Sequence, residues 1–206
     1  MRASGLCVLA LSASAAFAEP MEDRGYLIDC ADEEGASACL IVSRGVNLLV
    51  FEEGGTSPEV FASLKAMPWL STLSFDGTLG EIGDSSADIV LTSAKAEPDD
   101  LYEGNLRAMQ GQWAPEGEET PFFIDISGMD WTEVVQEELG DSFMMVLGEE
   151  CGNGITPGNG MVISLYRYGD DPEDDGCWRM EYIDESTMEL RDFKGEQGAV
   201  IFTRLP

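Results

Sequence analysis

The stretch Leu106-Arg107-Ala108-Met109-Gln110-Gly111-Gln112-Trp113 lies where the character of the chain changes. Its first half reads as the end of a helix, and Trp113 is followed at once by a segment rich in Pro, Gly and Glu. A bulky indole at such a boundary indicates that the chain enters a new unit there. We therefore expect a separate domain over residues 106–206.

Apolar and polar residues alternate along most of the chain after Trp113, a pattern typical of strands with one buried face. Eight candidate strands cover residues 111–113, 122–127, 131–138, 143–149, 161–168, 177–183, 188–192 and 200–205. The alternation places three side chains of one later strand on a common buried face, namely Trp178, Met180 and Tyr182. Eight antiparallel strands close a small barrel, which is the expected fold of this half.

Residues 131–138 are locally ambiguous. Asp130 and Glu133 have the spacing of a helix capping box, and the apolar positions that follow suit a helix as well as a strand. The barrel requires an eighth strand, so a strand is favoured here. The following Gly140-Asp141-Ser142 is expected to be a turn between two strands.

The first half is also rich in short β segments. Runs at 26–28, 39–42 and 46–51 precede a helix expected over 58–67, with Ser57 as its N-cap and Pro58 at its first position. Two more runs, 71–75 and 88–92, follow, with three glycines between them. The expected domain covers 19–97, and 98–105 is expected to be a linker or a connecting helix.

Three strands, a helix and two strands resemble the five-stranded OB barrel, in which a helix lies between the third and fourth strands. A small α+β domain would give the same order, so both remain open. No exposed aromatic platform or basic groove of a nucleic-acid-binding OB fold is visible. The fold class is therefore mainly β, an OB-like or α+β domain followed by an eight-stranded antiparallel barrel.

Gly111 and Trp113 on a first strand, an eight-strand meander and Arg204 on the last strand resemble the lipocalin or calycin superfamily. The resemblance implies that Trp113 closes the floor of the barrel and that the guanidinium of Arg204 lies over its ring. Such a cation–π contact stabilises by roughly 0.5 to 2 kcal/mol. The second half is shorter than most ligand-carrying lipocalins.

The second half is also similar to the small periplasmic inhibitors of bacterial metalloproteases, which are eight-stranded barrels too. The similarity rests on the motif formed by Leu106 and the following Gly111-Gln112-Trp113. A looser match is found at Trp178-Arg179, Asp184-Glu185 and Phe202-Thr203-Arg204. Those inhibitors use an extended N-terminal arm. Here a whole domain precedes the barrel, which speaks against that mechanism.

The first 18 residues have the pattern of an export signal. Arg2 supplies a basic start, residues 5–17 are apolar or small, and Ala16-Phe17-Ala18 has the spacing of a cleavage site. Cleavage near Ala18 predicts a periplasmic or secreted protein. No other segment is long and apolar enough for membrane insertion.

Four cysteines follow the signal, an even number that favours two disulfides in an oxidising compartment. Cys30 and Cys39 flank residues 31–38 and are expected to clamp a hairpin. Cys151 and Cys177 are then left to pair. A simple meander would place them about 20 Å apart, whereas a disulfide needs Cα atoms within about 7 Å, so the strand limits must differ, the loop 152–160 must fold down, or pairing must cross domains.

Charge and composition exclude several classes of function. The net charge of −29 repels nucleic acid and anionic membranes. The chain contains no His, so histidine triads and nearly all catalytic zinc sites are excluded, and Ser142 has no base to activate it. We expect a non-enzymatic protein without a cofactor. The many acids make a carboxylate-pair hydrolase possible only in principle.

One acidic segment is a weak candidate for Ca²⁺, which takes six to eight oxygen ligands. Its acids are Asp170, Asp171, Glu173, Asp174 and Asp175. The segment lacks EF-hand spacing, so a solvated hairpin loop is the better interpretation.

These observations together predict an exported acidic protein that binds a small apolar ligand or a protein partner through its barrel. Two alternatives stay open. One is an inhibitor of a secreted or periplasmic hydrolase of the metalloprotease or lysozyme type, and the other is a structural or interaction module of the cell envelope.

Overall fold

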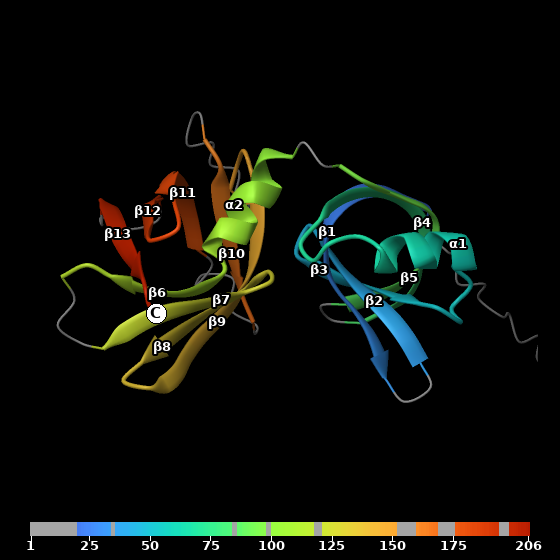
Figure 1. Ribbon diagram of the computed structural model, residues 1–206, viewed down its shortest axis with the longest axis horizontal. Helices are drawn as coiled ribbons and strands as arrows, with labels where there is room; N and C mark the ends of the chain where they lie inside the picture. The colour runs from blue at the N-terminus through green and yellow to red at the C-terminus, as the bar shows by residue number, and fades with distance from the viewer. Residues whose placement is uncertain are drawn as a thin grey trace, which may run out of the picture.

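The computed structural model describes residues 20–33, 36–83, 86–97, 100–117, 121–151, 160–168, 176–193 and 198–206. It confirms a mainly β fold with two closed barrels, one of five strands and one of eight. Figure 1 shows the barrels side by side, with the helix α2 leading into the second. The expected export signal, 1–18, and the five acids of the expected calcium loop lie outside the described residues.

The first barrel has the predicted order of three strands, a helix and two strands. Its strands close in the order β1-β2-β3-β5-β4, with β3 and β5 parallel and the other pairs antiparallel. The elements are β1 Pro20–Glu33, β2 Ala36–Ser43, β3 Val46–Phe51, α1 Pro58–Lys65, β4 Thr72–Ile82 and β5 Ser86–Ala96. This order and pairing match the predicted OB-like arrangement.

The strands of this barrel are longer than predicted. β1 and β2 extend beyond the Cys30 and Cys39 pair, because Ala31 pairs with Ala38 and Glu33 pairs with Ala36. The glycines after residue 75 do not end a strand either, since β4 continues through Gly77. A Cβ on Gly77 would lie 2.8 Å from the Val90 carbonyl oxygen, so close approach of two strands requires the glycine here.

The helix α1 forms as the sequence predicts. The Ser57 hydroxyl accepts a hydrogen bond from the Val60 amide at 3.3 Å, and Pro58 occupies the first turn. Phe61 and Leu64 are buried in the core of the five-stranded barrel. The apolar face of this helix therefore covers that barrel.

The second barrel is all antiparallel and closes in the order β10-β11-β12-β13-β6-β7-β8-β9. The helix α2, Leu101–Met109, precedes it. Its strands are β6 Gly111–Pro115, β7 Phe122–Ser127, β8 Asp130–Val135, β9 Glu138–Gly148, β10 Val162–Arg167, β11 Gly176–Ile183, β12 Thr187–Asp192 and β13 Ala199–Arg204. The connecting helix therefore ends at Met109, shortly before the first strand of the barrel begins at Gly111.

The ambiguous segment after Asp130 is a strand followed by a tight hairpin turn. Gln136 and Glu137 both adopt left-handed backbone conformations, with φ of 55° and 67°. Two such residues in a row are the geometry of a type I′ turn, which matches the twist of the flanking strands. The turn predicted at Gly140-Asp141-Ser142 is therefore wrong, because those residues lie inside β9.

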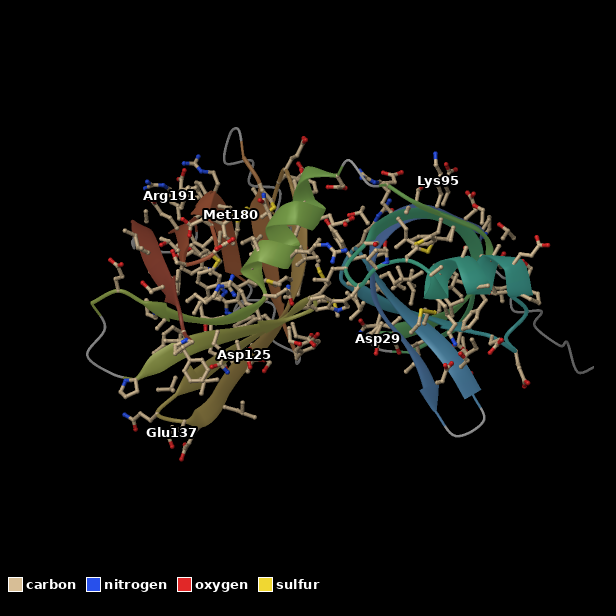
Figure 2. The ribbon with its side chains drawn as sticks, viewed as in Figure 1. Asp29, Lys95, Asp125, Glu137, Met180 and Arg191 are labelled. Atoms are coloured by element: carbon tan, nitrogen blue, oxygen red, sulfur yellow. A yellow bond between two sulfur atoms is a disulfide. The ribbon has the colours of Figure 1, made fainter. Side chains whose placement is uncertain are left out.

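The predicted common face of β11 is also wrong in part. Met180 points into the barrel (Figure 2) and is buried, whereas Tyr182 is exposed. The register shifts between these two residues, opposite Leu190 and Glu189 of β12. A β-bulge adds one residue and reverses the side-chain alternation beyond it.

Apolar side chains of the first barrel join the core of the second. Val42 and Leu70 belong to the same buried cluster as Met129 and Met144, and Tyr26 packs against it. Leu70 is fully buried even though its φ is 59°, a conformation that costs a non-glycine residue about 1 kcal/mol or more. The two barrels therefore share a continuous apolar contact.

Candidate functional site

Trp113 lies in the core of the eight-stranded barrel beside the end of α2, and we call this end of the barrel its floor. Its side chain is 0 % exposed, and its indole Nε1 donates a hydrogen bond of 2.6 Å to the Met109 carbonyl at the end of α2. The Cζ atom of Arg204 lies 4.1 Å from the ring centroid. The guanidinium of Arg204 therefore lies over the indole ring of Trp113.

Arg204 also binds the end of the preceding helix. Its Nη2 donates to the Ala108 carbonyl at 2.5 Å, its Nη1 donates to the Gln110 carbonyl, and its Nε donates to the Glu185 carbonyl at 2.6 Å. A cation at the carboxyl end of a helix satisfies free carbonyls and interacts favourably with the helix dipole. One side chain thus joins α2, β13 and the β11–β12 turn.

Two neighbours of Trp113 are fixed by this packing. Gly111 has a φ of 108°, and a Cβ there would lie 2.9 Å from Arg204 Nη1, so glycine is required on both counts. Sequence reasoning did not find the role of Gln110. Its side-chain oxygen accepts from the Gly128 amide at 2.7 Å, and its nitrogen donates to the Gly128 carbonyl at 3.1 Å.

Both predicted disulfides are present. Cys30 and Cys39 lie opposite each other on β1 and β2, and Cys151 and Cys177 have Cα atoms 5.9 Å apart. The large separation expected for a simple meander is not found, because Cys177 pairs with Ser164 in the middle of β10. Cys177 therefore lies near the end of the barrel where Cys151 follows β9. Two disulfides indicate an oxidising, extracytoplasmic environment.

Two tryptophans stack in the interior of the eight-stranded barrel. Trp131 on β8 and Trp178 on β11 stack with ring centroids 6.5 Å apart. These strands are not neighbours in the sheet, so the rings meet across the interior. The Trp131 Nε1 is buried and has no hydrogen-bond partner within the described part of the chain.

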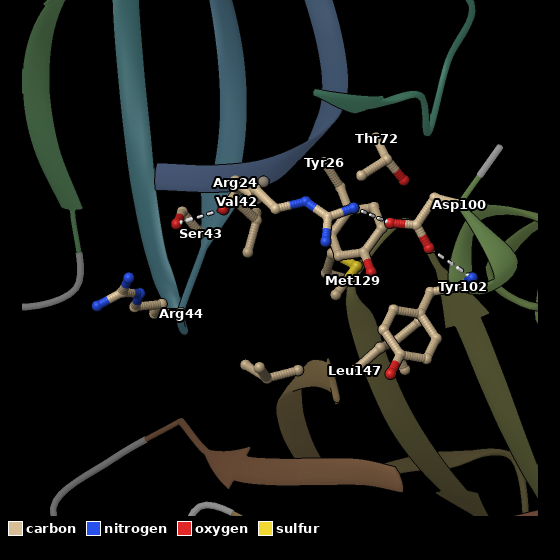
Figure 3. A pocket seen from close by; sticks show the side chains of 12 residues that line it. Arg24, Tyr26, Val42, Ser43, Arg44, Thr72, Asp100, Tyr102, Met129 and Leu147 are labelled. Atoms are coloured by element: carbon tan, nitrogen blue, oxygen red, sulfur yellow. Dashed lines mark hydrogen bonds and ion pairs between the residues drawn. The ribbon is translucent and has the colours of Figure 1, made fainter. Parts of the chain in front are cut away.

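A cavity of about 150 Å³ lies between the two barrels, and we call it the junction cavity. Figure 3 shows it from close by. Its walls come from both barrels and from the start of α2, and its lining residues include Arg24, Tyr26, Arg44, Thr72, Asp100, Tyr102, Val146 and Leu147. Binding sites occur preferentially at such interfaces between domains.

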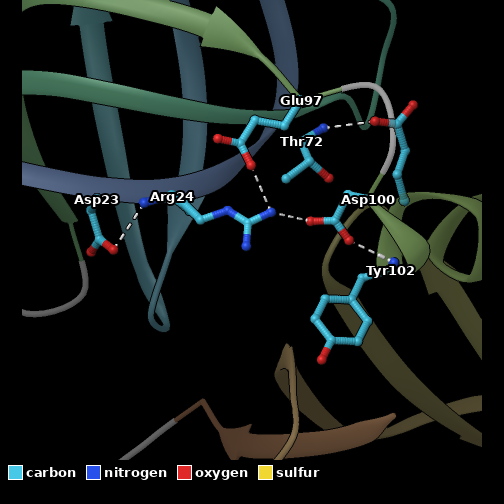
Figure 4. Close-up of polar contacts among 7 residues, drawn as sticks. Asp23, Arg24, Thr72, Glu97, Asp100 and Tyr102 are labelled. Carbon is cyan, nitrogen blue, oxygen red and sulfur yellow. Dashed lines mark hydrogen bonds and ion pairs between the residues drawn. The ribbon is translucent and has the colours of Figure 1, made fainter. Parts of the chain in front are cut away.

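The polar wall of the junction cavity centres on Arg24. Its Nη2 contacts an Asp100 oxygen at 2.5 Å and a Glu97 oxygen at 2.8 Å (Figure 4). Asp100 has a side-chain exposure of 5 % and also caps α2, accepting from the Tyr102 amide at 2.7 Å. The carboxylate of Asp100 is thus used twice, while Nε and Nη1 of Arg24 make no hydrogen bond within the described residues.

Three hydroxyl groups of the cavity wall, those of Tyr26, Thr72 and Tyr102, make no hydrogen bond within the described residues, whereas the Ser43 hydroxyl donates to Asp23 and to the Arg24 carbonyl. Burial raises the pKa of the Tyr26 phenol, and the Asp100 carboxylate raises it further. Burial also raises the pKa of Tyr102, with Glu149 and Asp100 adding to it. The Thr72 hydroxyl is buried and has no partner among the described residues.

A second cavity of about 390 Å³ lies at one end of the five-stranded barrel. Part of its polar wall is already paired, because Asp23 accepts a hydrogen bond from Ser43 and forms a salt bridge with Arg44. Ile82 in its apolar wall is 69 % exposed. It offers fewer groups that could orient a ligand than the junction cavity does.

Other kinds of site receive no support from the described residues. Within them, no three His, Cys, Asp or Glu side chains are grouped to hold a metal ion. No helix in the same part of the chain has the length and apolarity needed to cross a bilayer. No protein-family model and no curated protein matches the chain.

Proposed function

We propose that this chain is an exported, non-enzymatic binding protein that holds a small molecule in the junction cavity. The observation that carries the proposal is the contrast between its two interior spaces. The eight-stranded barrel contains the stacked Trp131 and Trp178 in its interior, whereas the junction cavity has polar groups without partners beside an apolar wall. A few polar groups in a mostly apolar pocket are typical of ligand sites.

Native mass spectrometry of the exported protein tests this proposal, together with a thermal-shift screen of small organic molecules. Val146, half-buried in the cavity wall, is changed to Trp to fill the cavity. Ile201→Trp is the matched control, because Ile201 is an exposed apolar strand residue in the same barrel. We expect a bound molecule or a stabilising compound for the wild type and Ile201→Trp, and none for Val146→Trp.

Two results would count against the junction cavity. Binding that persists in Val146→Trp would place the ligand elsewhere, and a wild type stabilised by no compound would remove the small-ligand function. Both variants must unfold cooperatively near the wild-type temperature for the comparison to hold.

A second candidate is an inhibitor of a secreted hydrolase of the metalloprotease or lysozyme type. It is favoured by the tip of the β8–β9 hairpin, where Leu139 is 81 % exposed and Val135 is exposed beside it. An N-terminal arm mechanism is not favoured, because residues from Pro20 to Tyr26 pair with β4. Stoichiometric inhibition assays with the wild type and Leu139→Asp test it, and undiminished hydrolase activity at equimolar protein would remove it.

A further inference from the structure

The guanidinium groups of the junction cavity are already paired within the protein. Nη2 of Arg24 contacts Asp100 at 2.5 Å and Glu97 at 2.8 Å. Arg44 holds the Asp23 carboxylate through Nε at 2.8 Å and through Nη2 at 2.9 Å. An anion would have to displace one of these carboxylates, because neither arginine keeps an unused pair of parallel donors.

A cation finds no unused carboxylate in the cavity wall either. Asp100 is the one acid among the described residues that line the cavity, and it already binds Arg24 and the Tyr102 amide. The acids beside the cavity outnumber the guanidinium groups, which attracts a cation toward the entrance. An ammonium group that lost its water inside would still lie beside Arg24 without an acid of its own, and burial of an unpaired charge is costly. The wall therefore favours an uncharged molecule.

The groups that remain for a ligand are the three hydroxyls of Tyr26, Thr72 and Tyr102, none of which has a partner in the described part of the chain. Thr72 is only 2 % exposed and its hydroxyl oxygen is buried. Figure 3 shows both tyrosine rings on the side of the cavity where Asp100 lies. A buried hydroxyl without a partner lowers stability, and a ligand that supplies the partner recovers this loss. A hydroxyl group on the ligand suits all three, because it can both donate and accept.

The apolar wall limits the size of what can bind. It consists of Val42, Met129, Val146 and Leu147. The cavity has a volume of about 150 Å³, and an apolar cavity of roughly this size in another protein binds benzene. The hydrocarbon body of a ligand should therefore contain about six or seven carbons.

We propose that the junction cavity binds a small uncharged alcohol or phenol, whose hydroxyl group is held by Tyr26, Thr72 and Tyr102. This inference rests on the proposed function and adds the chemical class of the ligand. An alcohol and a phenol share the chemistry, so the test has to separate them.

Isothermal titration calorimetry with matched probes tests the class of ligand. Benzyl alcohol and 4-methylphenol are isomers, toluene lacks their oxygen, and benzoate and benzylammonium carry opposite charges on a similar body. We expect the better of the two isomers to bind at least about fivefold more tightly than toluene, because it gains hydrogen bonds. It should bind at least about tenfold more tightly than either ion, because the ions bury a charge without a partner. The order of the two isomers assigns an alcohol or a phenol.

A triple variant, Tyr26→Phe with Thr72→Val and Tyr102→Phe, tests the three hydroxyls together. It keeps the shape of the wall and removes groups that have no partner in the described chain, so its melting temperature should not fall. Its affinity for the better isomer should drop to that for toluene, while the affinity for toluene stays at the wild-type value. Thr72→Val alone should weaken binding of the isomer a few-fold, and it serves as the test if the triple variant does not fold.

Tyr182→Phe is the matched control for these variants. It also removes a phenol hydroxyl, one that binds Asp184 on the exposed surface of the eight-stranded barrel. Its affinity for every probe should equal that of the wild type.

The inference fails if toluene or either ion binds as tightly as the better isomer, if the variants at the three hydroxyls keep the wild-type affinity, or if neither isomer binds at millimolar concentration. In these cases the proposed function still stands when another compound stabilises the wild type but not Val146→Trp. When no compound does so, both fail together.

Discussion

Two tryptophans are buried in the same barrel, and their surroundings differ. Trp113 at the floor and Trp131 in the interior are 0 % and 1 % exposed. The Nε1 of Trp113 binds the Met109 carbonyl and its ring lies under Arg204. The Nε1 of Trp131 has no partner in the described residues, and its ring stacks on Trp178.

Burial of an indole contributes to stability through its area, but an unpaired N–H subtracts from that contribution. Leaving a buried donor without a partner costs about 1 to 3 kcal/mol. Trp113 therefore fixes the ends of several elements with all its polar groups satisfied. Trp131 fills space in the interior at the cost of one hydrogen bond.

The largest effect is expected for Trp113→Ala. Deleting a buried tryptophan costs roughly 3 to 5 kcal/mol, and here the loss also removes the contact that orders the end of α2. Urea unfolding measures the free energy, and Gln112→Ala, at an exposed position on the same strand, should change it by less than about 0.5 kcal/mol. A cost below about 1 kcal/mol for Trp113→Ala would contradict the proposed stabilising role of Trp113 at the floor.

Arg204→Ala tests the polar half of the floor. It removes the cation–π contact and the donors to three carbonyls, of Ala108, Gln110 and Glu185. We expect a loss of about 2 to 4 kcal/mol. Arg204→Lys should recover part of this loss, because it restores the charge at the end of α2 without the planar fork. If Arg204→Ala left the free energy of unfolding unchanged, water would hydrogen-bond to these carbonyls as well as Arg204 does.

Replacing each tryptophan by Phe makes the comparison sharper. Trp113→Phe loses the hydrogen bond to Met109 and should cost about 1 to 3 kcal/mol. Trp131→Phe also removes the unpaired N–H, so its cost should stay within about 1 kcal/mol. Thermal and urea unfolding of the two variants measure the difference. Equal costs would mean that Trp131 Nε1 has a partner, such as an internal water.

The succession of strands and helices along the chain was predictable, because alternation, the Ser57 cap and the Gly111-Gln112-Trp113 stretch are local signals. The hairpin at Gln136 and Glu137 was not, since neither residue is typical of a turn that needs two positive φ values. The bulge before Tyr182 was missed for a related reason: its cause lies in the pairing with β12 and not in β11 itself.

The junction cavity could not be predicted from the sequence. Arg24, Thr72, Tyr102 and Val146 come from four segments that local patterns do not connect. They meet because Val42 and Leu70 pack into the core of the neighbouring barrel. Such a site depends on how the two barrels pack against each other, and this packing leaves no periodic pattern in the sequence of either barrel.

The smallest effect concerns the turn that supports the floor. Asp184 accepts hydrogen bonds from Tyr182, Ser186 and Thr187, which lower the pKa of its carboxyl to about 2 from 3.8. The Glu185 carbonyl of this turn receives Arg204 Nε. The unfolded chain takes up a proton near 3.8 and the folded chain only near 2, so the contribution of Asp184 is complete above the higher value and is lost as the pH falls through the lower one.

Asp184→Asn keeps the turn geometry and removes the charge, so the melting temperature of the variant should lie below that of the wild type at neutral pH. The gap should narrow as the pH falls from about 5 toward about 2, because the wild-type carboxyl then becomes protonated too. Glu185→Gln, which leaves the carbonyl in place, should follow the wild type throughout. A gap that stays constant over this range would show that titration of the Asp184 carboxyl does not make the stability of this turn depend on pH.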